Sequence, residues 1–363
     1  MVRATIGVLP GDYIGPEITR EALKVLDAIN RKYGWDIRTV HLEASGEAYD
    51  KYGKHLPDHT LEKAATCDAL LKGPFGGPPE ELHHPKWSGV EQGAILPLRK
   101  HFDLFMNLRE TKVYPSLIQH SPIKEDIVAD TNILIVRELT SGIYFGKKEE
   151  RIVDNEREYS DVEAYRESEI RRIALRAFEI ARNRRKKVTL VAKSNVLKSS
   201  VLWREVVQEV AKDFPDVVLD YMHVDNAAMQ LILNPRQFDV ILTNNMFGDI
   251  LSDEASVLSG SIGLLPSASL GSSTFGLYEP IHGSAPSIAG KNIANPISAI
   301  LCIALMLRYT FDKEQQAQEI ENAVEKVLEQ GYRTADLVQG RPDVQVVGTD
   351  RMGDLITKQI LGS

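Results

Sequence analysis

The chain has 363 residues, of which 43% are hydrophobic and 26% charged, and its net charge is −8. This length suggests two domains or one large α/β unit, and the composition is that of an ordinary globular protein. The acidic balance argues against nucleic acid or an anionic membrane as the main partner.

The beginning of the chain and its cysteines indicate the expected compartment. Residues 1–10 are typical of a first strand and lack the apolar region of a signal peptide. The longest apolar stretch, residues 297–307, is too short to span a bilayer. Cys67 and Cys302 lie far apart in apolar surroundings, which predicts buried free thiols. We therefore expect a cytoplasmic protein without a membrane partner.

Strand-like and helix-like segments alternate along the chain. Short runs rich in Val, Ile and Leu predict strands at residues 4–9, 69–72, 133–138, 187–192, 217–224 and 238–243. Helical patterns occupy residues 16–33, 60–65, 163–184, 199–214, 225–234, 295–311 and 315–330. This alternation predicts parallel strands joined by crossover helices. The polar segment 147–166 is expected to be an exposed arm or a loop, and residues 264–273 a turn-rich crossing between regions.

The most informative segment, residues 245–253, places Asp249 and Asp253 four residues apart on a predicted helix. Residues at this spacing share one helix face, and two like charges there weaken a helix, so we expect a positive group to offset them. Carboxylate oxygens are the ligands that Mg²⁺ and Mn²⁺ prefer. A solvated helix face is the better explanation of an isolated pair of this kind. Here, however, the apolar run at residues 238–243 directly precedes the pair and predicts a buried strand. Both acids would then lie at the carboxyl end of this strand, where open α/β sheets bind ligands.

Charged residues follow or end several predicted strands. Arg137 ends one strand and Lys193 another, while Asp225 and Asp249 follow two more. This recurrence predicts a cleft with a metal site and carboxylate-binding arginines, because an arginine buried without a partner is costly. Tyr144 is either a half-buried aromatic residue or the partner of Lys193 in acid–base chemistry.

The common nucleotide fingerprints are absent. Residues 9–16 follow the first strand but do not form the G-x-G-x-x-G pattern, and the chain has neither a Walker A sequence nor a G-x-S-x-G elbow. Residues 279–291 contain glycines that would let the backbone approach a ligand closely. Taken alone, such a segment is more often just a turn.

Taken together, these motifs resemble those of the β-decarboxylating dehydrogenases that act on (R)-2-hydroxy acids. The resemblance extends from Gly7 to about Asp354, and its motifs lie at residues 9–17, 98–100, 107–109, 137–146, 193–197, 249–253, 265–271 and 282–286. It implies the two-domain α/β fold of isocitrate and isopropylmalate dehydrogenases, with a central sheet flanked by helices. Residues 1–104 and 260–363 would form the cofactor-binding domain. Residues 105–259 would form the domain with the dimer interface, the metal site and an arm.

The resemblance also assigns roles to side chains. Three arginines, Arg99, Arg109 and Arg137, would bind the carboxylates of a malate. Three aspartates, Asp225, Asp249 and Asp253, would bind Mg²⁺ or Mn²⁺, with Asp225 also touching the substrate. Asp225 and Lys193 would come from the second subunit of a homodimer with shared active sites. Lys193 would help to deprotonate the substrate hydroxyl through water, and Tyr144 would protonate the enol carbon after decarboxylation.

The implied cofactor is NAD. Its predicted contacts are Gly76, Gly77, Glu91, Asn195, His282, Gly283, Ser284, Ala285, Ser287, Ile288 and Asn295. Ser287 stands where NAD-dependent members usually carry an aspartate that binds the adenosine ribose, which leaves the choice between NAD and NADP open.

The substrate prediction depends on Ile95 and Leu96, one turn before Arg99, because two aliphatic side chains suit an isopropyl group. Leucine biosynthesis is the implied pathway, while D-malate or tartrate as substrate and an inactive nucleotide-binding relative stay as alternatives.

Overall fold

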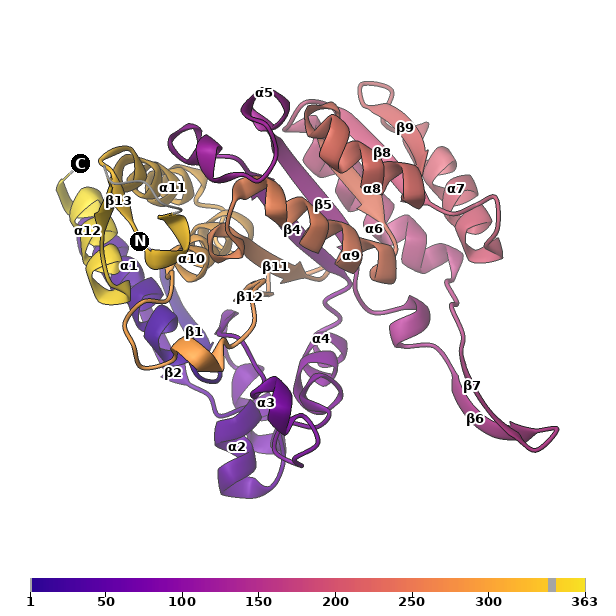
Figure 1. Ribbon diagram of the computed structural model, residues 1–363, viewed down its shortest axis with the longest axis horizontal. Helices are drawn as coiled ribbons and strands as arrows, with labels where there is room; N and C mark the ends of the chain where they lie inside the picture. Colours follow the sequence, from indigo (N-terminus) through magenta and orange to yellow (C-terminus); the bar gives the residue numbers. More distant parts are fainter. Residues whose placement is uncertain (1, 339–343, 363) are drawn as a thin grey trace. The chain divides into compact units, whose positions relative to one another are not determined.

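The computed structural model describes residues 2–338 and 344–362, which fold into two compact units. Unit 1 comprises Met1–Leu104, Tyr114–Pro122 and Ser259–Ser363, and unit 2 comprises Phe105–Val113 and Ile123–Leu258. Each unit consists of parallel and antiparallel β-strands flanked by helices (Figure 1), which confirms the predicted α/β class.

Within unit 1 the β-strands lie in the order β2-β1-β3-β12-β11. Its strands are β1 (Arg3–Leu9), β2 (Asp36–His41), β3 (Ala69–Lys72), β11 (Pro266–Leu270) and β12 (Gly276–Pro280). All neighbouring strands in this order run parallel except β11 and β12, which form an antiparallel pair.

Helices of unit 1 cover its sheet. They are α1 (Gly15–Tyr33), α2 (Ser45–Tyr52), α3 (Asp58–Ala64), α4 (Leu96–His101), α10 (Ile297–Tyr309), α11 (Glu314–Glu329) and α12 (Thr349–Gly362). A short π-helix, Glu91–Ile95, precedes α4, and the small strands β13 (Tyr332–Arg333) and β14 (Gln345–Val346) pair with each other. Helix α1 begins with Pro16 and Glu17 in its first turn and ends at Gly34, whose φ of 63° lies in the left-handed region. Helix α10 is apolar on all sides and buried over residues 297–307, as its composition predicts.

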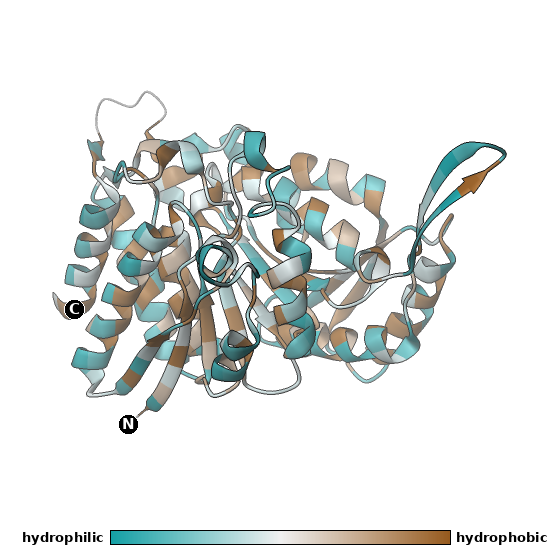
Figure 2. Cartoon of the chain, turned by 90° about the horizontal axis from the view of Figure 1, so that it is seen from below, coloured by the Kyte–Doolittle hydropathy of each residue, from teal (hydrophilic) through white to brown (hydrophobic). Residues whose placement is uncertain are grey.

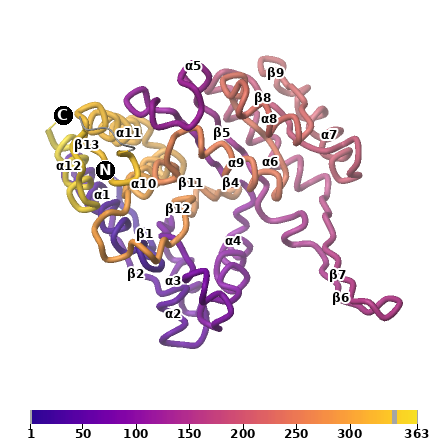
Figure 3. The backbone as a smooth tube through the Cα atoms, viewed as in Figure 1, coloured from indigo at the N-terminus to yellow at the C-terminus, as the bar shows by residue number. Residues whose placement is uncertain are grey.

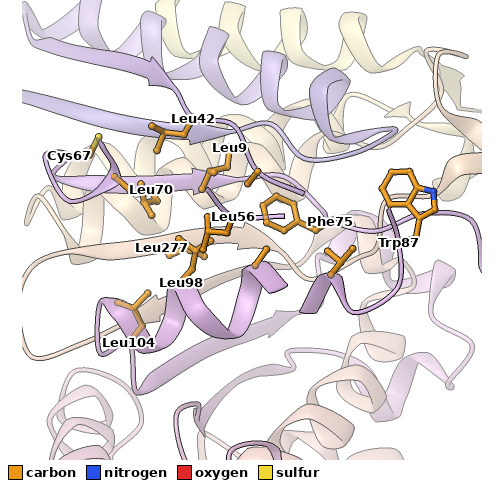
Figure 4. Close-up of a cluster of buried hydrophobic side chains, with 14 residues drawn as sticks. Leu9, Leu42, Leu56, Cys67, Leu70, Phe75, Trp87, Leu98, Leu104 and Leu277 are labelled. Atoms are coloured by element: carbon orange, nitrogen blue, oxygen red, sulfur yellow. The ribbon is translucent and has the colours of Figure 1, made fainter. Parts of the chain in front are cut away.

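A hydrophobic cluster joins the strands of unit 1 to the helices α3 and α4. Its buried side chains come from segments far apart in sequence and include Leu9, Leu42, Leu70, Leu98 and Leu277 (Figure 4). Ile95 packs against this cluster as a partly buried neighbour. The cluster therefore fixes the helix that carries Arg99.

Within unit 2, β-strands lie in the order β4-β5-β10-β8-β9. Its strands are β4 (Met106–Lys112), β5 (Asn132–Glu138), β8 (Lys187–Ala192), β9 (Val218–His223) and β10 (Val240–Thr243). Strands β5, β10, β8 and β9 are parallel, whereas β4 is antiparallel to β5. The helices of the unit are α5 (Glu125–Val128), α6 (Glu167–Arg182), α7 (Lys198–Ala211), α8 (Val224–Leu233) and α9 (Asn245–Ser256).

A two-stranded hairpin extends from the rest of unit 2 (Figure 3). It consists of β6 (Lys148–Val153) and β7 (Glu156–Asp161), paired antiparallel, and lies within the segment predicted to be an arm or a loop. Most of the hairpin is hydrophilic, but a hydrophobic stretch lies near its tip (Figure 2). Strand β6 ends with Ile152, which is 68% exposed, and Val153, which is 37% exposed.

Two predictions from the sequence were wrong. Residues 266–270, expected in a turn-rich crossing, form the fully buried strand β11. The parallel pattern is interrupted by the antiparallel pairs β4–β5 and β11–β12. Both free cysteines are buried as expected. Among the helices built from residues 2–338 and 344–362, none is long and apolar enough to cross a bilayer.

Candidate active site

The parallel strands of unit 2 bring the predicted polar residues to one edge of its sheet. Arg137 is the second-last residue of β5, where it pairs with Thr243 of β10, and Lys193 follows β8. Asp225 and Asp249 lie in the helices that follow β9 and β10. Parallel strands end at the same edge of a sheet, where open α/β sheets bind ligands. The register thus places these residues at the kind of edge that the sequence predicted.

Helix α9 presents a polar face at this edge. The Asn244 side chain accepts a hydrogen bond of 2.8 Å from the Phe247 amide and so caps the helix. Asn245, Asp249, Ser252 and Asp253 then follow at helical spacing on one face. The helix therefore carries two carboxylates, an amide and a hydroxyl toward the same side.

Arg137 is almost fully buried and uses its whole guanidinium group. Nε and Nη2 donate to Asn245 Oδ1 at 3.0 and 2.7 Å, and Nη1 donates to Asp249. A Cβ atom at Gly248 would lie 2.6 Å from Arg137 Cγ, so glycine makes room for the arginine stem. A buried arginine needs such partners, because an unpaired charge in the interior is costly.

Arg109 is the second cation of the cluster. Its Nε donates to Asn107 Oδ1 at 2.9 Å, and its Nη1 donates to Ser252 Oγ at 2.8 Å and Asp253 Oδ1 at 3.1 Å. Nη2 lies 3.4 Å from Asp249 Oδ1. The prediction that a positive group offsets the two aspartates is therefore confirmed by two arginines.

Tyr144 joins the same cluster. Its hydroxyl donates to Asp249 Oδ2 at 2.9 Å, and its ring lies 5.7 Å from the Arg137 guanidinium. Burial raises the pKa of Tyr144, and the Asp249 carboxylate raises it further through its charge and the hydrogen bond. The phenol thus stays protonated at neutral pH and can act as a proton donor.

The two carboxylates of α9 stay partly open to solvent. The side chain of Asp253 is 63% exposed and that of Asp249 is 33% exposed. Partial desolvation raises the pKa of Asp253; Asp249 adds to this effect, and Arg109 opposes it. No group of three or more acidic, histidine or cysteine side chains in the described part of the chain is arranged to hold a metal. A hard divalent ion that takes two protein carboxylates, with the remaining oxygens from water and substrate, fits this donor set.

Lys193 and Asp225 form a separate contact. Lys193 Nζ donates to Asp225 Oδ1, and this bond lowers the pKa of Asp225. The Lys193 amide is held by a 3.1 Å hydrogen bond to Ser200 Oγ. Asp225 is 62% exposed, so the pair is open to solvent.

In unit 1, Arg99 is held by a buried acid. Its Nη2 donates to Glu279 Oε1 at 3.1 Å, while Glu279 Oε2 accepts from Lys72 Nζ. Burial by itself would raise the pKa of Glu279, but the Lys72 and Arg99 charges hold it at about 2. The buried Nε of Arg99 has no hydrogen-bond partner within the described chain. Ile95 and Leu96, both half-buried, lie one turn before Arg99.

The predicted cofactor residues fall in both units, with Asn195 exposed in unit 2 and the others in unit 1. Gly76 has a φ of 123°, and a Cβ atom at Gly76, Gly283 or Gly290 would meet nothing within 4 Å. His282 Nδ1 lies 3.0 Å from Gly283 O, whereas its Nε2 is buried without a partner in the described chain. Burial lowers the pKa of His282. An orphaned ring nitrogen beside an accessible backbone suits a polar ligand such as a nucleotide.

The sequence reasoning missed several supporting residues. Asn245 and Ser252 share the face of α9 with the two aspartates, so helical spacing could have indicated them. Asn107 lies two residues before Arg109 on the same side of β4, which the period of a strand could have indicated. Lys72 and Glu279 lie 207 residues apart, and no local pattern connects them.

Comparisons with known proteins agree with this architecture. The model of the isocitrate/isopropylmalate dehydrogenase family matches residues 5–356. A 3-isopropylmalate dehydrogenase of Escherichia coli (strain K12) is 53% identical over 357 residues, which cover 98% of this chain and 97% of that protein. That of Salmonella typhimurium has the same identity and coverage.

Solved structures give the same result. The crystal structure of isocitrate dehydrogenase from Methylococcus capsulatus has a TM-score of 0.86 and 35% identity, with 99% of each chain covered. That of a beta-decarboxylating dehydrogenase from Thermococcus kodakarensis has a TM-score of 0.79 and 34% identity, covering 98% of this chain and 96% of the other. The chain belongs to the isocitrate/isopropylmalate dehydrogenase family. It is an oxidoreductase, a β-decarboxylating dehydrogenase.

Proposed function

We propose that the enzyme oxidises and decarboxylates (2R,3S)-3-isopropylmalate to 4-methyl-2-oxopentanoate with reduction of NAD, a step of leucine biosynthesis. The observation that carries this proposal is the cluster of Arg109, Arg137, Tyr144, Asp249 and Asp253 on one edge of a parallel sheet. The 53% identity with 3-isopropylmalate dehydrogenases supports the choice of substrate.

Arginines bind and orient the substrate in this proposal. Arg109 and Arg137 offer planar guanidinium groups whose orientation is fixed by Asn107, Ser252 and Asn245. Arg99 supplies a third cation with an unused Nε. Planar forks of this kind match carboxylates, and their fixed orientation avoids the entropy loss of ordering them during binding.

Asp249 and Asp253 would hold Mg²⁺ or Mn²⁺, with Asp225 of a second copy as a further ligand. When bound, the metal stabilises negative charge that develops on the substrate oxygen, and NAD accepts the hydride from C2. Arg109 contacts both aspartates and Arg137 contacts Asp249, so the two arginines hold the carboxylates in place. The cluster thus combines binding of the substrate with binding of the cation.

Two side chains move protons in this proposal. Lys193 of a second copy would accept the proton of the substrate hydroxyl through water. Tyr144 would donate its hydroxyl proton to the enol carbon after CO₂ leaves, since its raised pKa keeps the phenol protonated.

Substitution of Lys193 by Met should lower kcat by about 10²–10⁴-fold while NAD binding persists. Unchanged turnover would remove Lys193 from the mechanism.

Unit 1 would bind NAD through residues 76–91 and 282–295. The orphaned Nε2 of His282 and the open backbone at Gly76 and Gly283 are the features that suit a nucleotide. Ser287 is exposed and carries no charge that would repel a 2′-phosphate. Initial rates with NAD and NADP, and with the variant Ser287→Asp, measure how far this serine relaxes the preference.

A homodimer is the assembly that the surface of unit 2 favours. Helices α8 and α9 pack side by side and expose Met229, Leu233 and Ile250 by 56%, 63% and 59%. Apolar residues at helical spacing on adjacent exposed helices mark an interface. Leu233→Glu should produce monomers in sedimentation experiments, whereas Leu82→Glu, at a 55% exposed position of unit 1, should leave the dimer intact.

Shared active sites can be tested by complementation. The variants Lys193→Met and Asp249→Asn are each expected to be inactive alone. If each site combines Asp249 of one copy with Lys193 of the other, a mixed dimer contains one site with both residues and regains activity. If mixed dimers stay inactive, Lys193 and Asp249 act within one chain.

The substrate is tested by NADH absorbance with Mn²⁺ and NAD, comparing (2R,3S)-3-isopropylmalate with D-malate. We expect a strong preference for isopropylmalate. Replacement of Ile95 and Leu96 by Ser should lower kcat/KM for isopropylmalate by about 10–200-fold and leave D-malate turnover nearly unchanged. A preference of the wild-type enzyme for D-malate would retain the mechanism and refute the substrate.

A further inference from the structure

The loop between β1 and α1, residues 10–14, contacts both segments that are proposed to bind NAD. The Asp12 amide donates to Pro74 O at 2.8 Å, and the Asp12 carboxylate accepts from the Gly76 amide at 2.8 Å. Two residues later, the Ile14 amide donates to Ser284 O at 3.1 Å. The loop therefore connects the segment that begins at Gly76 with the segment that contains Ser284.

Tyr13, between these two anchors, has a φ of +52°, in the left-handed region. This conformation is rare for a bulky residue and persists only where the surroundings fix the backbone. Both neighbours are fixed: Asp12 and Ile14 are buried, and Asp12 also accepts from Ser45 Oγ at 2.6 Å and the Gly46 amide at 3.1 Å. A glycine would adopt the same backbone without strain, so the tyrosine side chain must contribute something that glycine would not.

The Tyr13 ring packs against Trp87. Their centroids lie 5.6 Å apart with the ring planes tilted by 42°. Trp87 is buried, and its Nε1 donates to Glu81 Oε2 at 3.0 Å. Its ring also covers Gly77, where a Cβ atom would lie only 2.3 Å from the indole. Tyr13 thus supports the tryptophan that covers the backbone of a proposed cofactor residue.

We propose that Tyr13 is a positioning residue for the nicotinamide cofactor. Its ring, acting through Trp87, holds residues 76–91 in the conformation that binds the dinucleotide. The strained backbone of Tyr13 is retained because it directs the ring toward Trp87 while Asp12 and Ile14 keep their hydrogen bonds. This inference rests on the proposed function, because it takes residues 76–91 as part of the NAD site.

The variant Tyr13→Gly removes the ring and relaxes the backbone. We expect KM for NAD to rise about three- to tenfold, the effect of losing one aromatic contact. The values of kcat and of KM for isopropylmalate should stay within about twofold, because Tyr13 belongs to unit 1, whereas Asp249, Arg109 and Arg137 belong to unit 2. The midpoint of thermal unfolding should stay within about 4 °C, since relief of strain offsets the lost contact. Tyr13→Phe keeps the ring and should retain the wild-type KM.

A double-mutant cycle with Trp87→Leu locates the effect. If Tyr13 acts through Trp87, Tyr13→Gly should add little to KM in the Trp87→Leu background. If Tyr13→Gly does not fold, Tyr13→Asn replaces it, because asparagine tolerates the left-handed conformation without an aromatic ring.

The proposal is overturned if KM for NAD is unchanged in the ring-deleted variant, or if Tyr13→Phe raises it equally. Full additivity of the two substitutions also overturns the route through Trp87. Calorimetric titration with NAD measures the same affinity without turnover. A wild-type enzyme that binds NAD but does not oxidise isopropylmalate would therefore refute the proposed substrate without touching this inference.

Discussion

Each unit of the protein contains a cluster of ion pairs between cationic side chains and carboxylates, but the two clusters differ in their exposure to water. In unit 1, Glu279 is 9% exposed at its side chain and is shared by Lys72 and Arg99, which are 3% and 11% exposed. In unit 2, Asp253 is 63% exposed and Asp249 33%. Cationic and carboxylate side chains therefore form a closed cluster in unit 1 (Lys72, Arg99 and Glu279) and an open cluster in unit 2 (Arg109, Arg137, Asp249 and Asp253).

The pKa values follow this difference. Burial alone would raise the pKa of Glu279, but two adjacent cations lower it to about 2. The pKa of Asp253 is raised instead, because partial desolvation and the charge of Asp249 outweigh the effect of Arg109. A carboxylate with both oxygens committed to buried cations stabilises structure, whereas a crowded and exposed pair of carboxylates gains from an added cation.

The largest expected effect is the loss of the closed cluster. Glu279→Ala leaves Lys72 and Arg99 buried without an anion, which should lower the free energy of unfolding by about 3–5 kcal/mol. Asp253→Asn, at the exposed position of the open cluster, should cost less than about 1 kcal/mol. Urea unfolding of both variants measures the contrast, and equal losses would refute the distinction between the clusters.

Acid should remove the contribution of the closed cluster. The pKa of Glu279 is about 2 in the folded protein and 4.5 ordinarily, so the folded state binds fewer protons. Its contribution, about 3 kcal/mol at most, is complete above pH 4.5 and declines as the pH falls from 4.5 toward 2. Comparison with Glu279→Gln checks this, because the stability difference between the two proteins should shrink over that interval. A constant difference between pH 6 and pH 3 would contradict the assigned pKa.

The open cluster was more predictable from the sequence than the closed one. Asp249 and Arg137 follow or end strongly hydrophobic runs, and helical spacing places Asp253 beside Asp249. Strand β11 was missed because small and polar residues at 266–269 have little strand preference and become a strand only by pairing with β12.

The local sequence does not indicate the long-range ion pair of unit 1 or the unusual backbone of Tyr13. Lys72 and Glu279 meet only because β3 and β12 are neighbours in the sheet. The left-handed backbone of Tyr13 follows from hydrogen bonds to Pro74 and Ser284, which the sequence around Tyr13 does not encode. Local periodicity thus predicts which faces of an element are polar. Contacts between segments distant in sequence determine which of these polar groups become buried.

Removal of one acid from the open cluster should affect function more than stability. Asp249→Asn should lower NAD reduction by at least about 100-fold, since a bound metal contributes several kcal/mol of charge stabilisation. In the absence of metal, the free energy of unfolding of this variant should fall by only about 1–2 kcal/mol, because Asn245 still pairs with Arg137. At 100 times its dissociation constant, Mn²⁺ should stabilise the wild type by about 2.7 kcal/mol and the variant much less. Glu254→Gln, on the same helix, is the matched control and should behave like the wild type.

The smallest expected effect separates charge from geometry at the open cluster. Arg109→Lys keeps the positive charge but loses the fork that reaches Asn107, Ser252 and Asp253. Because this fork would bind a substrate carboxylate equally in the ground state and the transition state, KM for isopropylmalate should rise about tenfold with kcat within about threefold. Arg176→Lys, an exposed pair with Glu179, should change neither constant. A fall in kcat at unchanged KM would mean that Arg109 acts on the reacting charge and does not only bind a substrate carboxylate.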